Sequence, residues 1–194
     1  MATLVYPVTL AMALGACLLS FLWGMGNAFV LPRRTTSRLK LTAASGAIFG
    51  FLHFWVILTS VNLLTFLVYA AFLCYLSALG LFWWTIVVTS RHRLPACFTS
   101  IEPSVLVTNG PYTLIRHPFY TSYLMVWAAG TMATLSLWLL STFLAMCMLY
   151  MSAARREEKG LLGGIHSAEY LRYRNRTGMF FPWHATRERP AQRS

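Results

Sequence analysis

Long apolar segments without a charged residue constrain this chain more than any other feature. Residues 3–31 carry no charge, and four further apolar runs follow at about 41–59, 63–89, 118–135 and 137–154. A helix needs roughly 20 apolar residues to cross the hydrocarbon core of a bilayer. Helices also satisfy their own backbone hydrogen bonds, which lipid cannot do. The sequence therefore predicts an all-α integral membrane protein with about five transmembrane helices.

The overall composition agrees with membrane insertion. The 194 residues are 57% apolar and 11% charged, with a formal net charge of +11, whereas soluble domains are usually about 45–50% apolar. The sixteen Lys and Arg stand between the apolar runs and form no basic stripe of the kind that nucleic-acid-binding proteins carry. We therefore expect membrane lipids around the chain and no nucleic-acid partner.

The cysteines predict neither a metal site nor a disulfide framework. Cys17, Cys74, Cys97 and Cys147 show no C-x-x-C pair and no Cys/His zinc spacing. Three of the four lie inside apolar runs, where a thiol behaves as a small apolar side chain. We expect no metal ion.

The distribution of positive charge predicts the orientation. Every Lys and Arg falls within residues 32–40, within 91–116, or from Arg155 onward. The N-terminus and the turns near Asn62 and Leu135 carry none. Basic loops stay on the cytoplasmic side of membranes. Five spans that alternate between these two sets of connections place the N-terminus outside and the C-terminus in the cytoplasm.

We expect one membrane domain over residues 1–194. Its parts are three N-terminal spans (1–90), a cytoplasmic connector (91–117), a catalytic helical hairpin with its tail (118–182) and a flexible tail (183–194). Gly163 and Gly164 should break the polar, helical C-terminal tail into two short helices, the second with Ser167 as its N-cap.

The stretch Val107-Thr-Asn-Gly-Pro-Tyr-Thr-Leu-Ile-Arg-His-Pro-Phe-Tyr120 joins the connector to the fourth span. Pro118 suits the first turn of a helix because it has no N–H to donate. The residue before a proline is disfavoured in the α region, so His117 should not be helical. Arg116 and His117 would then lie at the mouth of the helix, with Tyr120 one turn inside.

A second polar constellation follows the fifth span. Arg155-Arg-Glu-Glu158 is succeeded by Tyr170 and Tyr173, in a chain with only five acidic residues. One interpretation is a solvated helix end whose ion pairs contribute under about 1 kcal/mol each. The other is a functional site shared with the Arg116–Tyr120 stretch, because both constellations should meet at the cytoplasmic face.

Together these motifs resemble the isoprenylcysteine carboxyl methyltransferase family, which is similar in turn to the phospholipid N-methyltransferases. The resemblance rests on Asn-Gly-Pro-Tyr-x-x-x-Arg-His-Pro-x-Tyr120, an apolar hairpin, the Glu157-Glu158 pair about 40 residues after His117, Tyr-x-x-Tyr173 and a terminal Phe-Pro182. It covers about residues 104–182. Ser122, the spacing before Tyr170, and Ala153 in place of an arginine depart from the family pattern.

The resemblance implies a methyltransferase that uses S-adenosylmethionine without a Rossmann domain, and the sequence has no G-x-G-x-x-G motif. By the same resemblance the cofactor would be lined by one group of residues: Ser104, Val105, Leu106, Val107, Tyr112, His117, Pro118, Phe119, Tyr120, Glu157 and Glu158.

The acceptor should be a lipophilic small molecule or a lipidated substrate, with a carboxylate as the first choice. Methyl transfer to a carboxylate needs no general base, but it needs a cation that orients the acceptor, for which Arg156, Arg155 and Arg116 are the candidates. A phospholipid or amine acceptor would instead need a base, with His117 or Glu158 as candidates. A non-enzymatic scaffold whose basic face binds anionic lipid is the alternative outside enzymes.

Overall fold

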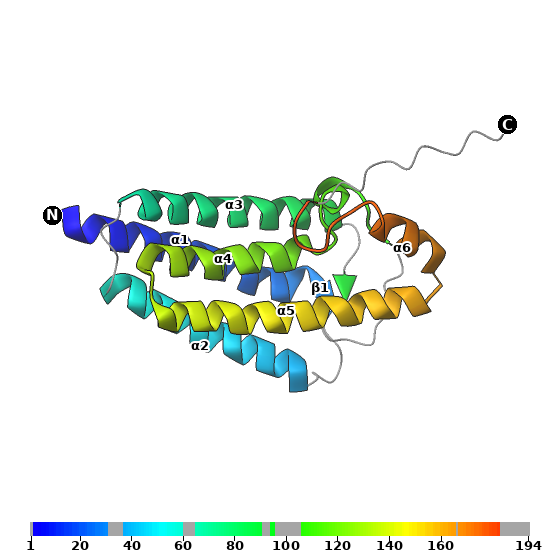
Figure 1. Cartoon of the computed structure of the whole chain (residues 1–194), viewed down its shortest axis with the longest axis horizontal. Coiled ribbons are helices and arrows are strands. Elements are labelled where there is room, and N and C mark those ends of the chain that lie inside the picture. Colours follow the sequence, from blue (N-terminus) through cyan, green and yellow to red (C-terminus); the bar gives the residue numbers. More distant parts are fainter. Residues whose placement is uncertain are drawn as a thin grey trace.

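Five long helices lie side by side, and the shorter elements gather at one end of them (Figure 1). The computed structural model describes residues 2–30, 37–59, 65–90, 94–95, 106–165 and 167–182. The elements in chain order are α1 (Ala2–Asn27), β1 (Phe29–Val30), α2 (Ser37–Thr59), α3 (Thr65–Thr89), β2 (Leu94–Pro95), the 3₁₀-helix η1 (Gly110–Thr113), α4 (Pro118–Thr134), α5 (Leu137–Gly163) and α6 (Ser167–Arg174).

Within the described residues, four helices are long and apolar enough to cross a membrane: α1 from Val5, α2, α3 and α5. They contain 23 to 27 residues, or about 35–40 Å at 1.5 Å per residue, against roughly 30 Å of hydrocarbon. The helix α4 has only 17 residues, about 26 Å. The predicted helical membrane character is thus confirmed, whereas the fifth span and the orientation stay predictions.

The bounds of three predicted spans are wrong. The second was predicted to begin at about Leu41, but α2 begins at Ser37. The first span was predicted to reach Leu31, but α1 ends at Asn27, whose Nδ2 donates to the Trp23 carbonyl (2.8 Å) and satisfies a free acceptor of the last turn. The fifth was predicted to end near Ala154, but α5 continues to Gly163. The residues that follow Ala154, from Arg155 to Lys159, are good helix formers, and no proline stops the helix before Gly163.

The length of α5 carries its polar end beyond the apolar layer. Its 27 residues extend about 40 Å, roughly 10 Å more than a bilayer core. The break at Gly163 and Gly164 is confirmed, because α6 starts at Ser167. One short helix therefore follows the break, while the residues before it belong to the long helix.

The helices α4 and α5 form the predicted hairpin through a turn of two residues, Leu135 and Ser136. Leu135 has φ 51°, in the left-handed region, and its N–H donates to the Thr131 carbonyl (2.8 Å). Such a conformation is strained for a residue with a Cβ. The tight turn keeps the start of α5 against the end of α4.

The core lies on the inner faces of α1, α3 and α4. Val126, Ala129 and Ala133 of α4 are fully buried against α1 and α3 residues such as Leu14 and Ala78. On the outer faces, large apolar side chains such as Phe51, Phe66 and Met148 are exposed. Each would stabilise the fold by about 1.5–3 kcal/mol if it were buried, so these faces suit lipid better than water.

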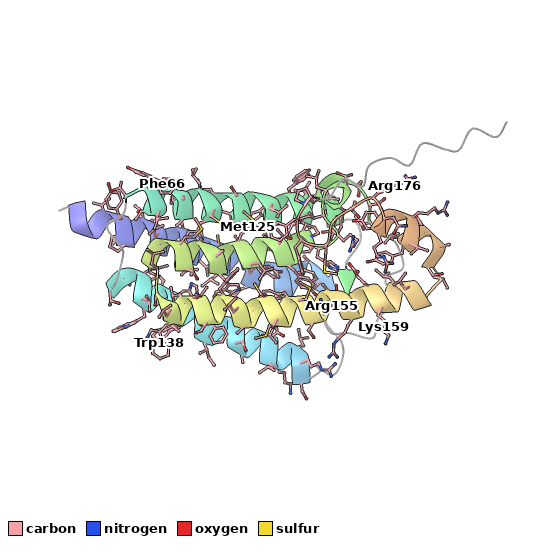
Figure 2. All side chains as sticks on the ribbon, viewed as in Figure 1. Phe66, Met125, Trp138, Arg155, Lys159 and Arg176 are labelled. Carbon is pink, nitrogen blue, oxygen red and sulfur yellow. The ribbon has the colours of Figure 1, made fainter. Side chains whose placement is uncertain are left out.

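The two ends of the bundle differ in chemistry. Phe66 and Trp138 lie at one end, and Arg155, Lys159 and Arg176 lie at the other (Figure 2). The basic end also holds η1, α6 and a short parallel pairing in which β1 follows α1 and β2 follows α3. Cations gathered at one end of an apolar helix bundle are typical of a protein that crosses a bilayer.

Candidate functional site

Because Pro118 starts α4, the residues just before it lie outside the helix, and their backbone N–H groups can bond to another segment of the chain. His117 has φ −125° and ψ 64° as the N-cap of α4, and Pro118 occupies the first turn, as predicted. The N–H groups of Arg116 and His117 are therefore not used inside a helix. They donate to the carbonyls of Gly178 (2.8 Å) and Met179 (3.1 Å), which brings the C-terminal tail alongside the motif.

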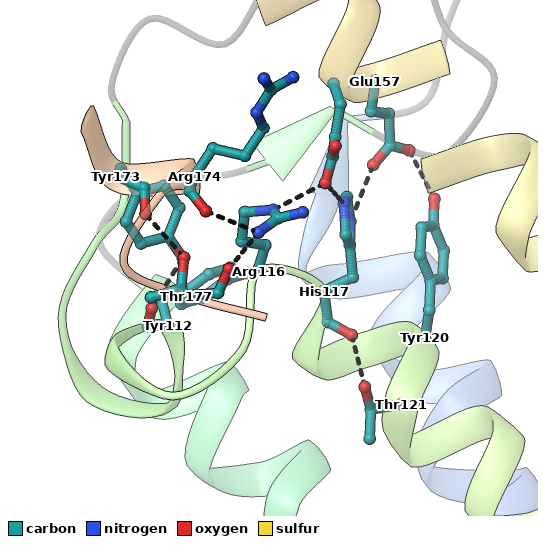
Figure 3. Close-up of polar contacts among 10 residues, drawn as sticks. Tyr112, Arg116, His117, Tyr120, Thr121, Glu157, Tyr173, Arg174 and Thr177 are labelled. Carbon is teal, nitrogen blue, oxygen red and sulfur yellow. Dashed lines mark hydrogen bonds and ion pairs between the residues drawn. The ribbon is translucent and has the colours of Figure 1, made fainter. Parts of the chain in front are cut away.

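Arg116 connects the motif, α5 and the tail. Its Nε donates to Glu158 Oε1 (2.8 Å), and its Nη1 donates to the carbonyls of Arg174 (3.1 Å) and Thr177 (Figure 3). The side chains of Arg116 and Glu158 are about 90% buried. Breaking a buried pair by removing one partner costs about 3–5 kcal/mol, because the other charge is left uncompensated. This contact fixes the end of α5 against the tail.

The imidazole of His117 lies between the two glutamates. Its Nε2 is 3.2 Å from Glu158 Oε1, and its Nδ1 is 3.7 Å from Glu157 Oε2. The hydroxyl of Tyr120 donates to the other oxygen of Glu157 at 2.5 Å. The two ring nitrogens point to different sides, so the carboxylates do not converge on one point, and no metal-binding group is found among the described residues.

The two glutamates differ in how well solvent or a ligand can reach them. The Glu157 side chain is 36% exposed, whereas that of Glu158 is 9% exposed. Glu158 is held by Arg116 and His117, while Glu157 has Tyr120 as its close donor. Glu157 is thus the carboxylate of the cluster that a bound molecule can approach.

A column of aromatic rings supports the cluster from the side of the bundle. The rings of His117 and Tyr120 stack with centroids 5.6 Å apart, and Tyr120 stacks on Tyr150 at 5.4 Å. Sequence reasoning missed Tyr150. It precedes Glu157 by seven residues, or about two helical turns, and this spacing could have placed both on one face of α5.

A second group of tyrosines locks the loop before the motif onto α6. The Tyr173 hydroxyl donates to the Tyr112 carbonyl (2.7 Å). Burial raises the pKa of Tyr173 to about 12 and also raises the pKa values of Tyr112 and Tyr170, so all three hydroxyls stay protonated at neutral pH. Gly110 permits the turn before Tyr112, because its φ is +58° and a Cβ there would lie 2.5 Å from Val88.

The structure brings together some of the predicted site residues and separates others. Tyr112, Arg116, His117, Tyr120, Glu157 and Glu158 meet at the basic end. Ser104 and Val105 lie outside the described residues, and Leu106 and Val107 form a half-buried stretch before η1. Pro118 and Phe119 are buried, and the Phe119 ring packs on Phe29 and Phe82 toward the bundle core.

Arg155 and Arg156 are exposed and do not join the cluster. Successive residues turn by about 100° around a helix. Arg155 is therefore roughly 160° away from Glu157 around α5, and Arg156 is roughly 100° away on the flank opposite Glu158. The carbonyls of Arg174 and Thr177, which accept from Arg116, could not be predicted from the sequence, since every residue has a backbone carbonyl.

A cleft opens on the outer side of the cluster, between the motif loop and α6. Its volume is about 610 Å³, and its lining consists of Thr108, Thr113, Glu169, Arg172, Tyr173, Arg176 and Thr177. Clefts of about 300–1,000 Å³ are typical of small-molecule sites. Thr177 belongs both to this lining and to the contacts of Arg116, so the cleft adjoins the buried ion pair.

Comparison with curated proteins finds a relative that is similar over part of the chain. The chain is 31% identical over 109 residues to the cobalt-zinc-cadmium resistance protein CzcN of Cupriavidus metallidurans. The similar region covers 55% of this chain and 44% of that relative, so the chain spans less than half of the relative's length. A search against protein families found no match.

Proposed function

We propose that this chain is a five-span membrane methyltransferase that uses S-adenosylmethionine and methylates a lipophilic acceptor, with a carboxylate as the first choice. The N-terminus would lie outside, and the site would face the cytoplasm. The observation that carries the proposal is the cluster of His117 and Tyr120 with Glu157 and Glu158, which joins two motifs from either side of an apolar hairpin. This is the pairing of motifs in the family that the sequence resembles.

The residues at the cluster fit the chemistry of the cofactor. S-adenosylmethionine carries a sulfonium, an ammonium, a carboxylate and ribose hydroxyls. The accessible oxygens of Glu157 can accept from an ammonium or from ribose. The rings of Tyr120 and His117 offer faces for a cation or for adenine.

The protein's contribution to the reaction is orientation and partial dehydration. When bound, the cofactor would supply an electrophilic methyl group for transfer to an oxygen of the acceptor carboxylate. Glu158 and Arg116 hold the tail closed over the motif, and Tyr120 fixes the rotamer of Glu157. No proton moves when the acceptor is a carboxylate.

The arginines divide into two roles under this proposal. Arg116 already binds three internal acceptors, so we assign it a positioning role. Arg156 and Arg155 remain the candidates for orienting an acceptor carboxylate, because both are exposed at the end where the apolar segment of α5 stops. Arg156 is the stronger candidate, since it is closer to Glu157 around the helix.

One observation favours a second candidate, a phospholipid or amine N-methyltransferase. The most exposed carboxylate of the cluster is that of Glu157, whereas Arg155 and Arg156 lie roughly 160° and 100° away from it around α5. A carboxylate attracts an ammonium acceptor and repels an acid. His117 or Glu158 would then be the base that removes a proton from the amine.

Two measurements on purified full-length protein test the proposal. Calorimetric titration with S-adenosylhomocysteine should show binding, and folded protein that binds none would refute a methyltransferase and favour a lipid-binding scaffold. Incubation with labelled S-adenosylmethionine and either a prenylcysteine analogue or phosphatidylethanolamine vesicles then decides the acceptor. Label in the prenylcysteine ester supports the carboxylate, and label in the phospholipid supports the amine.

A further inference from the structure

A second polar cluster lies inside the apolar part of the bundle, away from the basic end. His53 of α2, Tyr75 of α3 and Trp127 of α4 are each at most 3% exposed. His53 Nδ1, Tyr75 Oη and Trp127 Nε1 have no hydrogen-bond partner among the described residues. An unpaired polar group in an apolar environment costs about 1–3 kcal/mol, so each of these three groups calls for a partner.

The hydrogen-bond pattern around His53 fixes which nitrogen needs a donor. His53 Nε2 is 2.8 Å from Thr142 Oγ1, and that hydroxyl donates to the Leu139 carbonyl at 2.8 Å. A hydroxyl has a single hydrogen. Because Thr142 uses its hydrogen on Leu139, the histidine must donate from Nε2. A neutral His53 therefore presents a bare acceptor at Nδ1.

Gly130 of α4 is the point where these groups meet. A Cβ at Gly130 would lie 2.3 Å from His53 Nδ1 and 3.2 Å from Tyr75 Oη, so only glycine leaves room for both. Trp127 is one turn earlier on the same face, and its ring meets the His53 ring edge to face with centroids 5.0 Å apart. The His53 ring and the Tyr75 hydroxyl thus both pack against the backbone at Gly130 without bonding to each other.

We propose that His53, Tyr75 and Trp127 form an internal site for one bound water molecule. A water can donate to His53 Nδ1 and accept from the Tyr75 hydroxyl and the Trp127 N–H. These are three hydrogen bonds, the usual number for a buried water. The site would join α2, α3 and α4 directly, and α5 through Thr142, by polar contacts that lipid cannot replace. It is independent of the proposed methyl transfer.

Water-edited solid-state NMR on the ¹⁵N-labelled full chain in lipid bilayers tests this site. Magnetisation should pass from water to the His53 ring, assigned by its loss in His53→Phe, but not to the amide of Ala129, which is fully buried in the same region. No transfer to His53 in the parent protein would overturn the proposal. A direct hydrogen bond from Tyr75 to His53 Nδ1, seen as a scalar coupling, would overturn it as well.

Two glycine variants provide a matched comparison. Gly130→Ala should abolish the transfer, because the new methyl occupies the space beside Nδ1. Gly80→Ala, which adds the same methyl where nothing lies within 4 Å, should leave it unchanged. If Gly130→Ala does not fold, Tyr75→Phe removes one hydroxyl and should reduce the transfer several-fold. Undiminished transfer in folded Gly130→Ala or in Tyr75→Phe would refute the site.

Discussion

Replacing Arg116 by methionine should release the C-terminal tail from the motif. The guanidinium donates to Glu158 Oε1 and to the carbonyls of Arg174 and Thr177. Methionine keeps much of the volume of the side chain but none of these donors. In the closed state, the mostly buried Glu158 would keep its contact with His117 but lose the guanidinium that compensates its charge.

The size of the effect follows from the burial of the pair. Leaving one partner of a buried ion pair uncompensated costs about 3–5 kcal/mol. Opening the tail exposes Glu158 to water and relieves this cost, so the open state should gain population. At about 1.4 kcal/mol per tenfold, the population rises by roughly two to three and a half orders of magnitude.

Hydrogen exchange at two amides reports the opening. The N–H groups of residues 116 and 117 donate to the tail carbonyls of Gly178 and Met179, so they exchange when the tail detaches. Their exchange should accelerate at least a hundredfold in Arg116→Met. Arg155→Met is the matched control, because Arg155 is exposed and outside the cluster, and we expect a change below about twofold.

A double variant separates charge from packing. Arg116→Met combined with Glu158→Met removes the uncompensated charge, and apolar replacements of buried ion pairs are often neutral. Exchange in the double variant should therefore be slower than in Arg116→Met alone. An increase below tenfold in the single variant, or a double variant that simply adds two losses, would refute the view that this pair closes the tail.

Four further predictions address the function. Glu157→Gln should keep the fold but weaken cofactor binding tenfold or more, as expected for a charge-assisted bond of about 1.5–3 kcal/mol. An unchanged dissociation constant in calorimetry would mean that Glu157 is only part of a solvated helix end. Cysteine labelling from outside should reach a probe at Leu135 but not at Arg38, and labelling at Arg38 would reverse the orientation. With a carboxylate acceptor, Arg156→Ala should raise KM or lower kcat while cofactor affinity stays intact, and Arg156→Lys should restore only part of the lost activity. Parent rates in both Arg156→Ala and Arg155→Ala would weaken the carboxylate assignment. Methyl transfer should survive a metal chelator, and loss of activity that added zinc restores would contradict the absence of a metal.

The sequence alone determined the class of the fold and the two halves of the site. Runs of uncharged apolar residues require helices in lipid, because a chain in lipid must satisfy its own backbone hydrogen bonds. Pro118 and the glycines after α5 set helix bounds through local sterics, and the structure has them as predicted. Sequence reasoning also selected Arg116, His117, Tyr120 and both glutamates.

The tertiary structure decided which side chains face one another. In the sequence, Arg155 and Arg156 stand next to Glu157, but the 3.6-residue period of α5 turns them toward solvent while Tyr150, seven residues earlier, shares the Glu157 face. The hydrogen bonds from Arg116 to the tail carbonyls could not be predicted from the sequence, since every residue has a carbonyl. The proposed site at Gly130 could not be predicted for the same reason. His53, Tyr75 and Trp127 come from three helices, and only packing brings the His53 and Tyr75 side chains together beside Gly130 and the Trp127 ring against His53.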